Sequence, residues 1–231
     1  MKTIGLIGGM SWESTVEYYR IINEAVKERL GGFHSARIVL YSVDFAEVEA
    51  FQHRGQWDRA AVLLTEAARR VEAAGADFAL LCTNTMHRIF DRIQESVHIP
   101  LVHIADVTGR EVTARGLGRV GLLGTLFTME QEFYKGKLAE NYGLEILIPE
   151  EAERQAVHAI LYHELCLGEV KEASRRAFKK IIRGLEDRGA QGVILGCTEI
   201  PLIVRQADYK LPLFDTTDLH ARAAVELALR D

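Results

Sequence analysis

The chain has 231 residues, of which 48% are hydrophobic and 26% are charged, a composition typical of a globular protein with a large core. Lysine and arginine total 28 against 33 aspartates and glutamates, and the net charge of -5 argues against binding to nucleic acid or anionic membranes. No apolar run approaches the roughly 18 residues of a membrane span. The three cysteines show no C-x-x-C spacing, so neither a disulfide framework nor a zinc site is expected. We therefore expect a protein of the reducing cytoplasm.

Short apolar runs alternate with helical patterns along the first half of the chain. Strands are predicted at residues 3–8, 36–44, 77–82 and 99–105, and helices at residues 14–32, 58–76 and 85–97. This alternation predicts a mostly parallel sheet with helices on both faces.

Three blocks of the first half recur in the second half in the same order. The pairs are "IGLIGGM" (4–10) with "VGLLGTL" (120–126), "AGADFALLCTNTMH" (74–87) with "RGAQGVILGCTEIP" (188–201), and "IPLVHIAD" (99–106) with "LPLFDTTD" (211–218). All α/β sequences repeat strands, glycines and helices, but agreement of three blocks in order favours an internal duplication. We predict two similar pseudo-symmetric α/β lobes, residues 1–104 with 213–231 and residues 105–212. The active site is expected in the cleft between them.

The repeat also predicts how Cys82 and Thr83 are oriented. A gap-free alignment of Gly75 with Gly189 places Cys197 opposite Thr83. Successive side chains of a strand point to opposite faces. Thr83 is therefore expected to face the site and Cys82 the packing side, unless a bulge at the strand end re-aims one of them.

With Thr83-Asn84-Thr85-Met86-His87 and Gly196-Cys197-Thr198-Glu199 in this order, the chain resembles the aspartate/glutamate racemase family of the Asp/Glu/hydantoin racemase superfamily. The resemblance covers nearly the whole chain, including the opening "GLIGGM". The first motif of that family reads Cys-Asn-Thr-x-His, so this chain carries Thr83 in place of the first catalytic cysteine. The second motif is intact.

The resemblance implies a homodimeric amino-acid racemase, without pyridoxal phosphate or metal, for L-aspartate, L-glutamate or a broader set of amino acids. Cys197 and Thr83 would be the catalytic residues, and the second-motif cysteine of the family acts on the L enantiomer. Because each motif precedes a predicted helix, its N-terminus is expected to favour the Cys197 thiolate. A threonine hydroxyl is far less acidic than a thiol, so Thr83 would pass a proton or position a water. The implied substrate-binding residues are Met10, Arg54, Asn84, Thr85, Thr125, Lys171, Thr198 and Glu199.

Other interpretations stay open for these residues. Cys197 read alone would be a buried structural cysteine, and Thr83 with Asn84 would only cap the next helix. His87 is either a packed histidine or a site residue. Arg54 and Lys171, which the resemblance sets against an acidic substrate side chain, would otherwise be solvated surface groups.

Other functions also stay open, because one fold serves many reactions. The superfamily includes hydantoin racemases, maleate isomerases and one-thiol malonate decarboxylases, and a small-acid-binding protein without turnover is a further alternative. The loop at Gly8-Gly9-Met10 lacks the G-x-G-x-x-G spacing, and the chain has no Walker A lysine, so no nucleotide site is expected.

Overall fold

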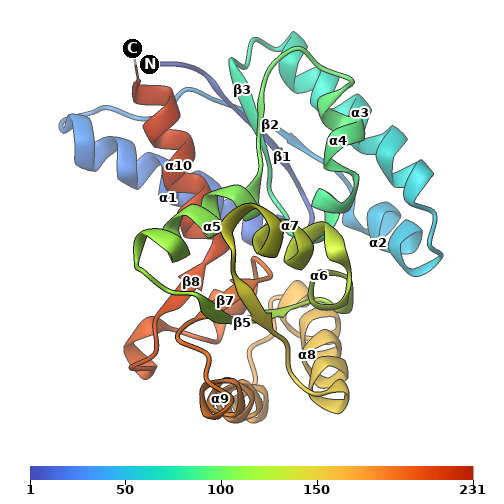
Figure 1. Cartoon of the computed structure of the whole chain (residues 1–231). Helices are drawn as coiled ribbons and strands as arrows, with labels where there is room; N and C mark the ends of the chain where they lie inside the picture. The colour runs from blue at the N-terminus through green and yellow to red at the C-terminus, as the bar shows by residue number, and fades with distance from the viewer. Residues whose placement is uncertain (231) are drawn as a thin grey trace. The chain divides into compact units, whose positions relative to one another are not determined.

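The computed structural model describes residues 1–230, which form two compact units. The first unit holds Met1–His103 and the chain from His220 onward, and the second holds Ile104–Leu219. Each unit contains one four-stranded sheet in which all strands run parallel (Figure 1). The predicted α/β class with two similar lobes is confirmed.

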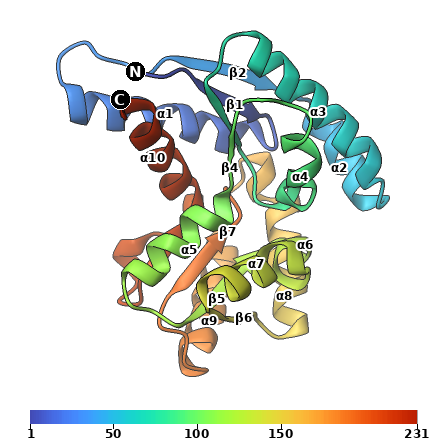
Figure 2. The same ribbon diagram turned by 45° about the horizontal axis from the view of Figure 1, so that its top comes forward.

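The sheet of the first unit has the strand order β2-β1-β3-β4. Its elements are β1 (Ile4–Gly8), α1 (Trp12–Leu30), β2 (Ile38–Ser42), α2 (Phe45–His53), α3 (Trp57–Ala73), β3 (Phe78–Leu81), η1 (Thr85–Ile89), α4 (Phe90–Gln94) and β4 (Leu101–Val102), with most of α10 (Thr216–Leu229). Helices α2, α3 and α4 bury one face of the sheet, and α1 and α10 bury the other (Figure 2).

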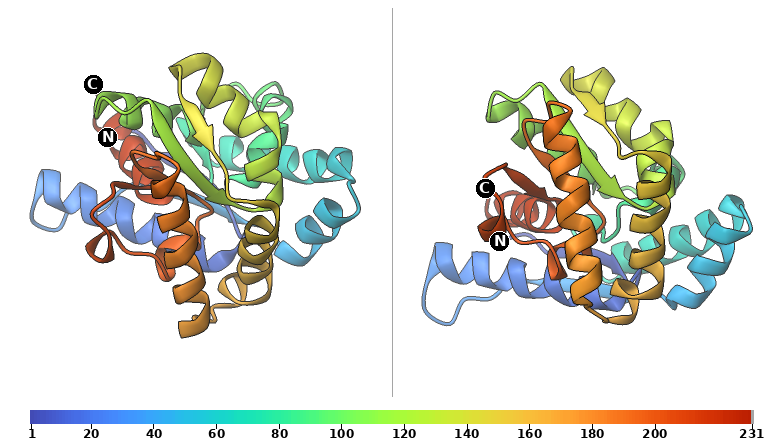
Figure 3. Two further views of the ribbon diagram at one scale, coloured as in Figure 1. Left: turned by 60° about the horizontal axis from the view of Figure 1, so that its bottom comes forward. Right: turned by 90° about the horizontal axis from the view of Figure 1, so that it is seen from below.

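The sheet of the second unit has the strand order β6-β5-β7-β8. Its elements are α5 (Ile104–Ala114), β5 (Arg119–Gly124), α6 (Leu126–Glu130), α7 (Glu132–Tyr142), β6 (Glu145–Leu147), α8 (Glu151–His163), η2 (Leu165–Leu167), α9 (Glu172–Asp187), β7 (Val193–Gly196), η3 (Ile200–Leu202), η4 (Gln206–Asp208) and β8 (Leu213–Asp215). Helices α5 and α7 pack together, and α9 lies across the sheet (Figure 3). All of these helices contribute to a single core.

The repeated blocks occupy equivalent strands of the two sheets. The first block forms the second strand in spatial order, β1 or β5, and the block that carries the motif forms the third strand, β3 or β7. Gly75 and Gly189 end the helices α3 and α9 with φ of +90° and +92°, a conformation that favours glycine. The internal duplication therefore extends to the turns.

Gly5 and Gly121 also correspond in the two units, and each allows a helix to approach its sheet closely. A Cβ atom at Gly5 would collide with the Val71 side chain of α3. A Cβ atom at Gly121 would lie 2.9 Å from Cδ1 of Leu185 in α9. Both helices can therefore pack directly on the central strands β1 and β5.

The segment after β3 differs from the sequence prediction. A continuous helix over residues 85–97 was expected, but the chain forms a 3₁₀ helix at Thr85–Ile89 and only one turn of α-helix at Phe90–Gln94. The expected strand over residues 99–105 is limited to Leu101–Val102, because α5 already begins at Ile104. None of the helices formed by residues 1–230 is sufficiently long and apolar to span a bilayer.

Candidate active site

The first motif follows β3 in the first unit. The backbone N–H of Cys82 donates to the Ile7 carbonyl of β1 at 2.9 Å, which continues the sheet pairing one residue beyond β3. Cys82 is fully buried among the residues that pack beneath α1 and α10. Burial raises the pKa of the Cys82 thiol above its ordinary value. The prediction that Cys82 faces the packing side is confirmed, and this thiol is poorly suited to ionise.

Thr83 is the residue at which the strand ends. Its N–H turns back to the Leu81 carbonyl at 2.8 Å, and its own carbonyl oxygen lies 2.7 Å from Nδ1 of His87. Asn84 occupies the N-cap position of η1, but its side chain makes no capping hydrogen bond. The interpretation of Thr83 and Asn84 as a simple side-chain cap is therefore not supported. Thr83, Asn84 and Thr85 are all buried.

The second motif follows β7 in the second unit, at the equivalent position. The Cys197 thiol donates to Oε2 of Glu199 at 2.9 Å, and the Thr198 hydroxyl donates to the same oxygen at 3.1 Å. All three side chains are buried. The Thr216 hydroxyl of α10 donates to the Leu195 carbonyl at 2.8 Å, so the start of α10 holds the end of β7.

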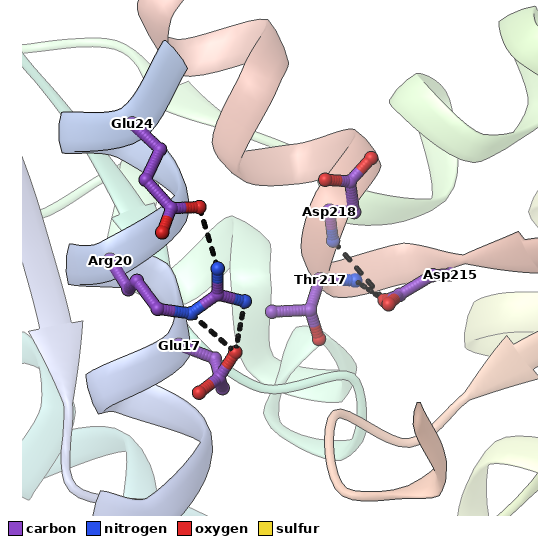
Figure 4. Close-up of polar contacts among 6 residues, drawn as sticks. All are labelled: Glu17, Arg20, Glu24, Asp215, Thr217 and Asp218. Carbon is purple, nitrogen blue, oxygen red and sulfur yellow. Dashed lines mark hydrogen bonds and ion pairs between the residues drawn. The ribbon is translucent and has the colours of Figure 1, made fainter. Parts of the chain in front are cut away.

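Asp215 closes this end of the sheet. Its carboxylate accepts hydrogen bonds from the N–H groups of Thr217 and Asp218 at 2.9 and 3.1 Å, as Figure 4 shows. These two bonds satisfy donors that the first turn of a helix leaves without an intrahelical partner. Asp215 therefore fixes the beginning of α10, which in turn supports β7.

The expected stabilisation of the Cys197 thiolate by a helix N-terminus is wrong for this structure. The helix after the motif is η3, a 3₁₀ helix of only 3 residues, and its aligned peptide dipoles are few. Burial raises the pKa of the Cys197 thiol well above its ordinary value, and the negative charge of Glu199 raises it further. The structure therefore places the Cys197 thiol 2.9 Å from the Glu199 carboxylate, in buried surroundings that disfavour the thiolate.

Two of the expected site residues lie in the loops after the first strands. Met10 follows the Gly8-Gly9 turn and is buried in the core beneath α3. A Cβ atom at Gly9, whose φ is +90°, would collide with the Val43 carbonyl, so this turn requires glycine. Thr125, the N-cap of α6, accepts a hydrogen bond from the Thr128 N–H at 3.3 Å, which gives it a structural role of its own.

The two expected cationic residues are both exposed. Arg54 ends α2, and across residues 1–230 its side chain makes no hydrogen bond or ion pair. Lys171 precedes α9, and its Nζ lies 3.0 Å from Glu169 and 3.7 Å from Glu164. The partners of Lys171 in this structure are therefore acidic residues of the chain itself.

The sequence analysis did not single out Gln52, His103 or His220. Gln52 is a buried polar residue on α2, and its Nε2 lies 3.0 Å from the Met86 sulfur next to the first motif. The helical spacing could have indicated its burial, since Gln52 follows Val48 by four residues on the buried face of α2. His103 and His220 lie 16 and 133 positions after His87 (103 minus 87 and 220 minus 87), so neither helix nor strand spacing connects them to it. Within residues 1–230 no group of three or more His, Cys, Asp and Glu side chains is arranged to hold a metal.

These observations first define a class: a duplicated α/β protein with a Thr-Asn-Thr motif and a Cys-Thr-Glu motif at equivalent strand ends. The family model described as Asp/Glu/Hydantoin racemase matches residues 7–224, and the chain belongs to this family.

Relatives with solved structures or assigned names resemble the chain over their whole lengths. A candidate Asp/Glu racemase from Yersinia pestis is 52% identical with a TM-score of 0.92, and the match covers 100% of both chains. An aspartate racemase homologue from Pyrococcus horikoshii OT3 is 37% identical with a TM-score of 0.85 over 100% of both chains. The broad specificity amino-acid racemase RacX of Bacillus subtilis is 22% identical over 235 residues, which cover 98% of each protein.

Proposed function

We propose that this chain is an amino-acid racemase that needs no pyridoxal phosphate and acts on aspartate, glutamate or a broader set of amino acids. The observation that carries the proposal is the buried hydrogen bond of 2.9 Å between the Cys197 thiol and the Glu199 carboxylate. A thiol paired with a proton acceptor is the type of group that removes a proton from carbon. The names of the Pyrococcus and Bacillus relatives support the same assignment.

The reaction begins with the proton of Cys197. Glu199 accepts this proton, and the thiolate then removes the Cα proton of the L enantiomer, so that a C–H bond breaks and an S–H bond forms. The electron pair left on Cα is reprotonated on the opposite face, and no oxidant or reductant is needed. In this proposal Glu199 acts on the thiol as well as near the substrate, because its carboxylate already contacts Cys197.

Thr83 supplies the proton on the opposite face, either from its hydroxyl or through a water that it positions. The donor then regains a proton from solvent, and Glu199 releases to solvent the proton that it accepted. The proposal requires that both motifs serve one substrate. Asn84, Thr85 and Thr198 would donate hydrogen bonds to the substrate α-carboxylate. Arg54 and Lys171 would neutralise an acidic substrate side chain, and for Lys171 this means an exchange of its present carboxylate partners.

The test is a panel of L- and D-amino acids in deuterated buffer, read by chiral chromatography and mass spectrometry. A racemase incorporates deuterium at Cα and moves each enantiomer toward an equal mixture. A binding protein leaves label and chirality unchanged, and a decarboxylase releases carbon dioxide. Activity should persist after dialysis against a chelator and treatment with a carbonyl reagent, and strict dependence on added pyridoxal phosphate or metal would contradict the proposal.

We also propose that the enzyme is a cytoplasmic homodimer that associates through α1. Trp12, Val16 and Tyr19 are 64%, 52% and 54% exposed, and their spacing places them on one side of the helix. Large aromatic residues of this kind are enriched at protein interfaces. Arg20 beside this apolar stripe is neutralised within α1, since it donates to Glu17 and Glu24 at 2.6 Å each (Figure 4). The stripe is therefore suited to a second copy of itself around a two-fold axis.

Sedimentation of the Val16→Glu variant tests the association. The added charge should convert a dimer to a monomer, whereas Val62→Glu, at a still more exposed position on α3, should leave the mass unchanged. A wild-type protein that sediments as a monomer at micromolar concentration would contradict the proposed dimer without bearing on catalysis.

A further inference from the structure

Three histidines come together beneath the first motif, inside the first unit. His87 lies in η1, His103 directly follows β4, and His220 lies in α10. The ring centroid of His87 is 4.6 Å from that of His103 and 6.0 Å from that of His220. The three residues are 3%, 8% and 0% exposed. Since no sequence motif joins them, only the fold reveals this cluster.

The partners of His220 determine which ring nitrogen carries its proton. Nε2 lies 2.9 Å from the Val102 carbonyl oxygen, which can only accept, so Nε2 is the donor. Nδ1 lies 2.9 Å from the Tyr18 hydroxyl and accepts from it in the neutral ring. His220 thus joins α1, α10 and the end of β4 with both nitrogens in use.

His87 performs a different task at the start of η1. Its backbone N–H donates to the Asn84 carbonyl at 3.1 Å, the pairing three residues back that defines a 3₁₀ helix. In an α-helix that N–H would instead have paired with the carbonyl of Thr83. The His87 side chain supplies the replacement, because its Nδ1 lies 2.7 Å from the Thr83 carbonyl oxygen and must be the donor.

The surroundings disfavour the charged forms of His87 and His220. Phe90 stacks on His87 at 5.5 Å with an interplanar angle of 11°. Burial lowers the pKa of His87 well below its ordinary value, and the neighbouring His103 and His220 lower it further. Burial likewise lowers the pKa of His220 to about 3. The titratable groups that face the cluster from the packed elements are His103 after β4, His220 on α10 and Tyr18 on α1.

We propose that His87 is a positioning residue for Thr83: its Nδ1–H group holds the Thr83 carbonyl and thereby aims the first motif, with His103, His220 and Phe90 fixing the orientation of the ring. The inference rests on the proposed racemase function for its catalytic consequence. It predicts that loss of this bond disturbs the Thr83 half of the reaction and spares the Cys197 half, because Cys197 belongs to the other unit.

The variants His87→Leu and His87→Asn test the bond. Leucine fills part of the space without a donor, whereas the Nδ2 group of asparagine replaces Nδ1 of histidine. His87→Leu should lower Cα exchange from the D enantiomer and inversion by about 10- to 100-fold, as expected for a misplaced reacting group. Exchange from the L enantiomer should change little. His87→Asn should recover most of the lost inversion, and His98→Leu, the same change at an exposed histidine, should resemble the wild type.

An NMR spectrum of the wild-type protein tests the bond from His87 to Thr83 without an activity measurement and without a variant. Nitrogen-15 NMR of the imidazole rings should show His87 with its proton on Nδ1 and His220 with its proton on Nε2. His87 with its proton on Nε2 alone would overturn the proposal. So would His87→Leu and His87→Asn variants that are folded and equally impaired, since that result would assign His87 to packing alone. Absence of exchange in the wild type would overturn the proposed function, and the spectrum would still decide whether His87 holds Thr83.

Discussion

The Cys197 thiol and the Glu199 carboxylate share a hydrogen bond of 2.9 Å inside the second unit. Burial raises the pKa of the Cys197 thiol well above its ordinary value, and the negative charge of Glu199 raises it further. In the proposed mechanism, this pairing takes the place of a helix dipole in activating the cysteine. The sequence alone placed Glu199 among the substrate-binding residues. Its hydrogen bond to Cys197 supports a second role for Glu199, which is to act on the thiol.

The first prediction concerns these two residues. Cys197→Ser should lower turnover by about 100- to 10,000-fold, since it removes the acid–base group. Glu199→Gln should keep the thiol but lose its proton acceptor, so activity should fall, and because the charge that raises the Cys197 pKa is also removed, the limb of the pH profile that reports the thiol should move to lower pH. The measurement is the pH profile of kcat/KM for L-aspartate or L-glutamate. A Glu199→Gln profile with the wild-type shape and a raised KM would assign Glu199 to substrate binding alone.

The second prediction concerns Cys82. This thiol is fully buried in the core, so Cys82→Ala should leave turnover unchanged and lower the free energy of unfolding by about 1 kcal/mol, a typical value for a small core truncation. Chemical denaturation and the racemisation assay would be run on the same preparation. An inactive but folded Cys82→Ala protein would show that Cys82 reaches the substrate.

Sequence reasoning succeeded where the information is local or repeated. Strand alternation, a short-range property, predicted that Cys82 faces the packing side, and Cys82 is buried there. Sequence reasoning failed for the helix after Thr83, since a helical hydrophobic pattern does not distinguish a 3₁₀ turn from an α-helix. It also could not foresee the cluster of His87 and His220, which are 133 positions apart in the numbering (220 minus 87) and meet only through α10.

The third prediction concerns acid. His87 and His220 have pKa values below those of the unfolded chain, about 6.5, so the unfolded state binds more protons as the pH falls. Stability is therefore fully present above about pH 6.5 and decreases below it, by up to about 1.4 kcal/mol per pH unit for each histidine. Urea unfolding from pH 7 to pH 4.5 would measure this slope.

The variant His220→Gln provides the control for the loss of stability in acid. Glutamine keeps a donor for the Val102 carbonyl but cannot take up a proton, so the stability of the variant should depend less steeply on pH. Parallel curves for the variant and the wild type would show that His220 does not contribute to acid sensitivity.

The fourth prediction compares Gly121 on β5, which faces α9, with Gly184, which lies within α9 itself. Gly121→Ala would bring a Cβ atom within 2.9 Å of Leu185, so it should lower the free energy of unfolding by about 1–3 kcal/mol. Gly184→Ala, within α9, meets no atom within 4 Å and should raise it by up to about 1 kcal/mol. Thermal or urea unfolding of both variants gives the comparison. Equal effects would contradict the close approach of α9 to β5.

The fifth prediction concerns the direction of the reaction. With one thiol, the enzyme should exchange the Cα hydrogen of L substrates faster than that of D substrates. The equilibrium constant between enantiomers is one, so this asymmetry appears only in rates. Exchange of the Cα hydrogen of the L enantiomer should also be faster than inversion, because Cys197 can return a solvent proton to the same face from which it removed the substrate proton.

Thr83→Cys provides the matched variant for this prediction. It introduces the Cys-Asn-Thr sequence that the resemblance implies for this position, and Thr83 is buried at a strand end where a side chain of similar size is accommodated. The variant should raise D-side exchange and inversion while L-side exchange changes little. Deuterium incorporation and inversion, measured separately from each enantiomer, would show this. Equal exchange rates from L and D in the wild type would contradict the one-thiol mechanism and indicate that Thr83 transfers protons as readily as Cys197.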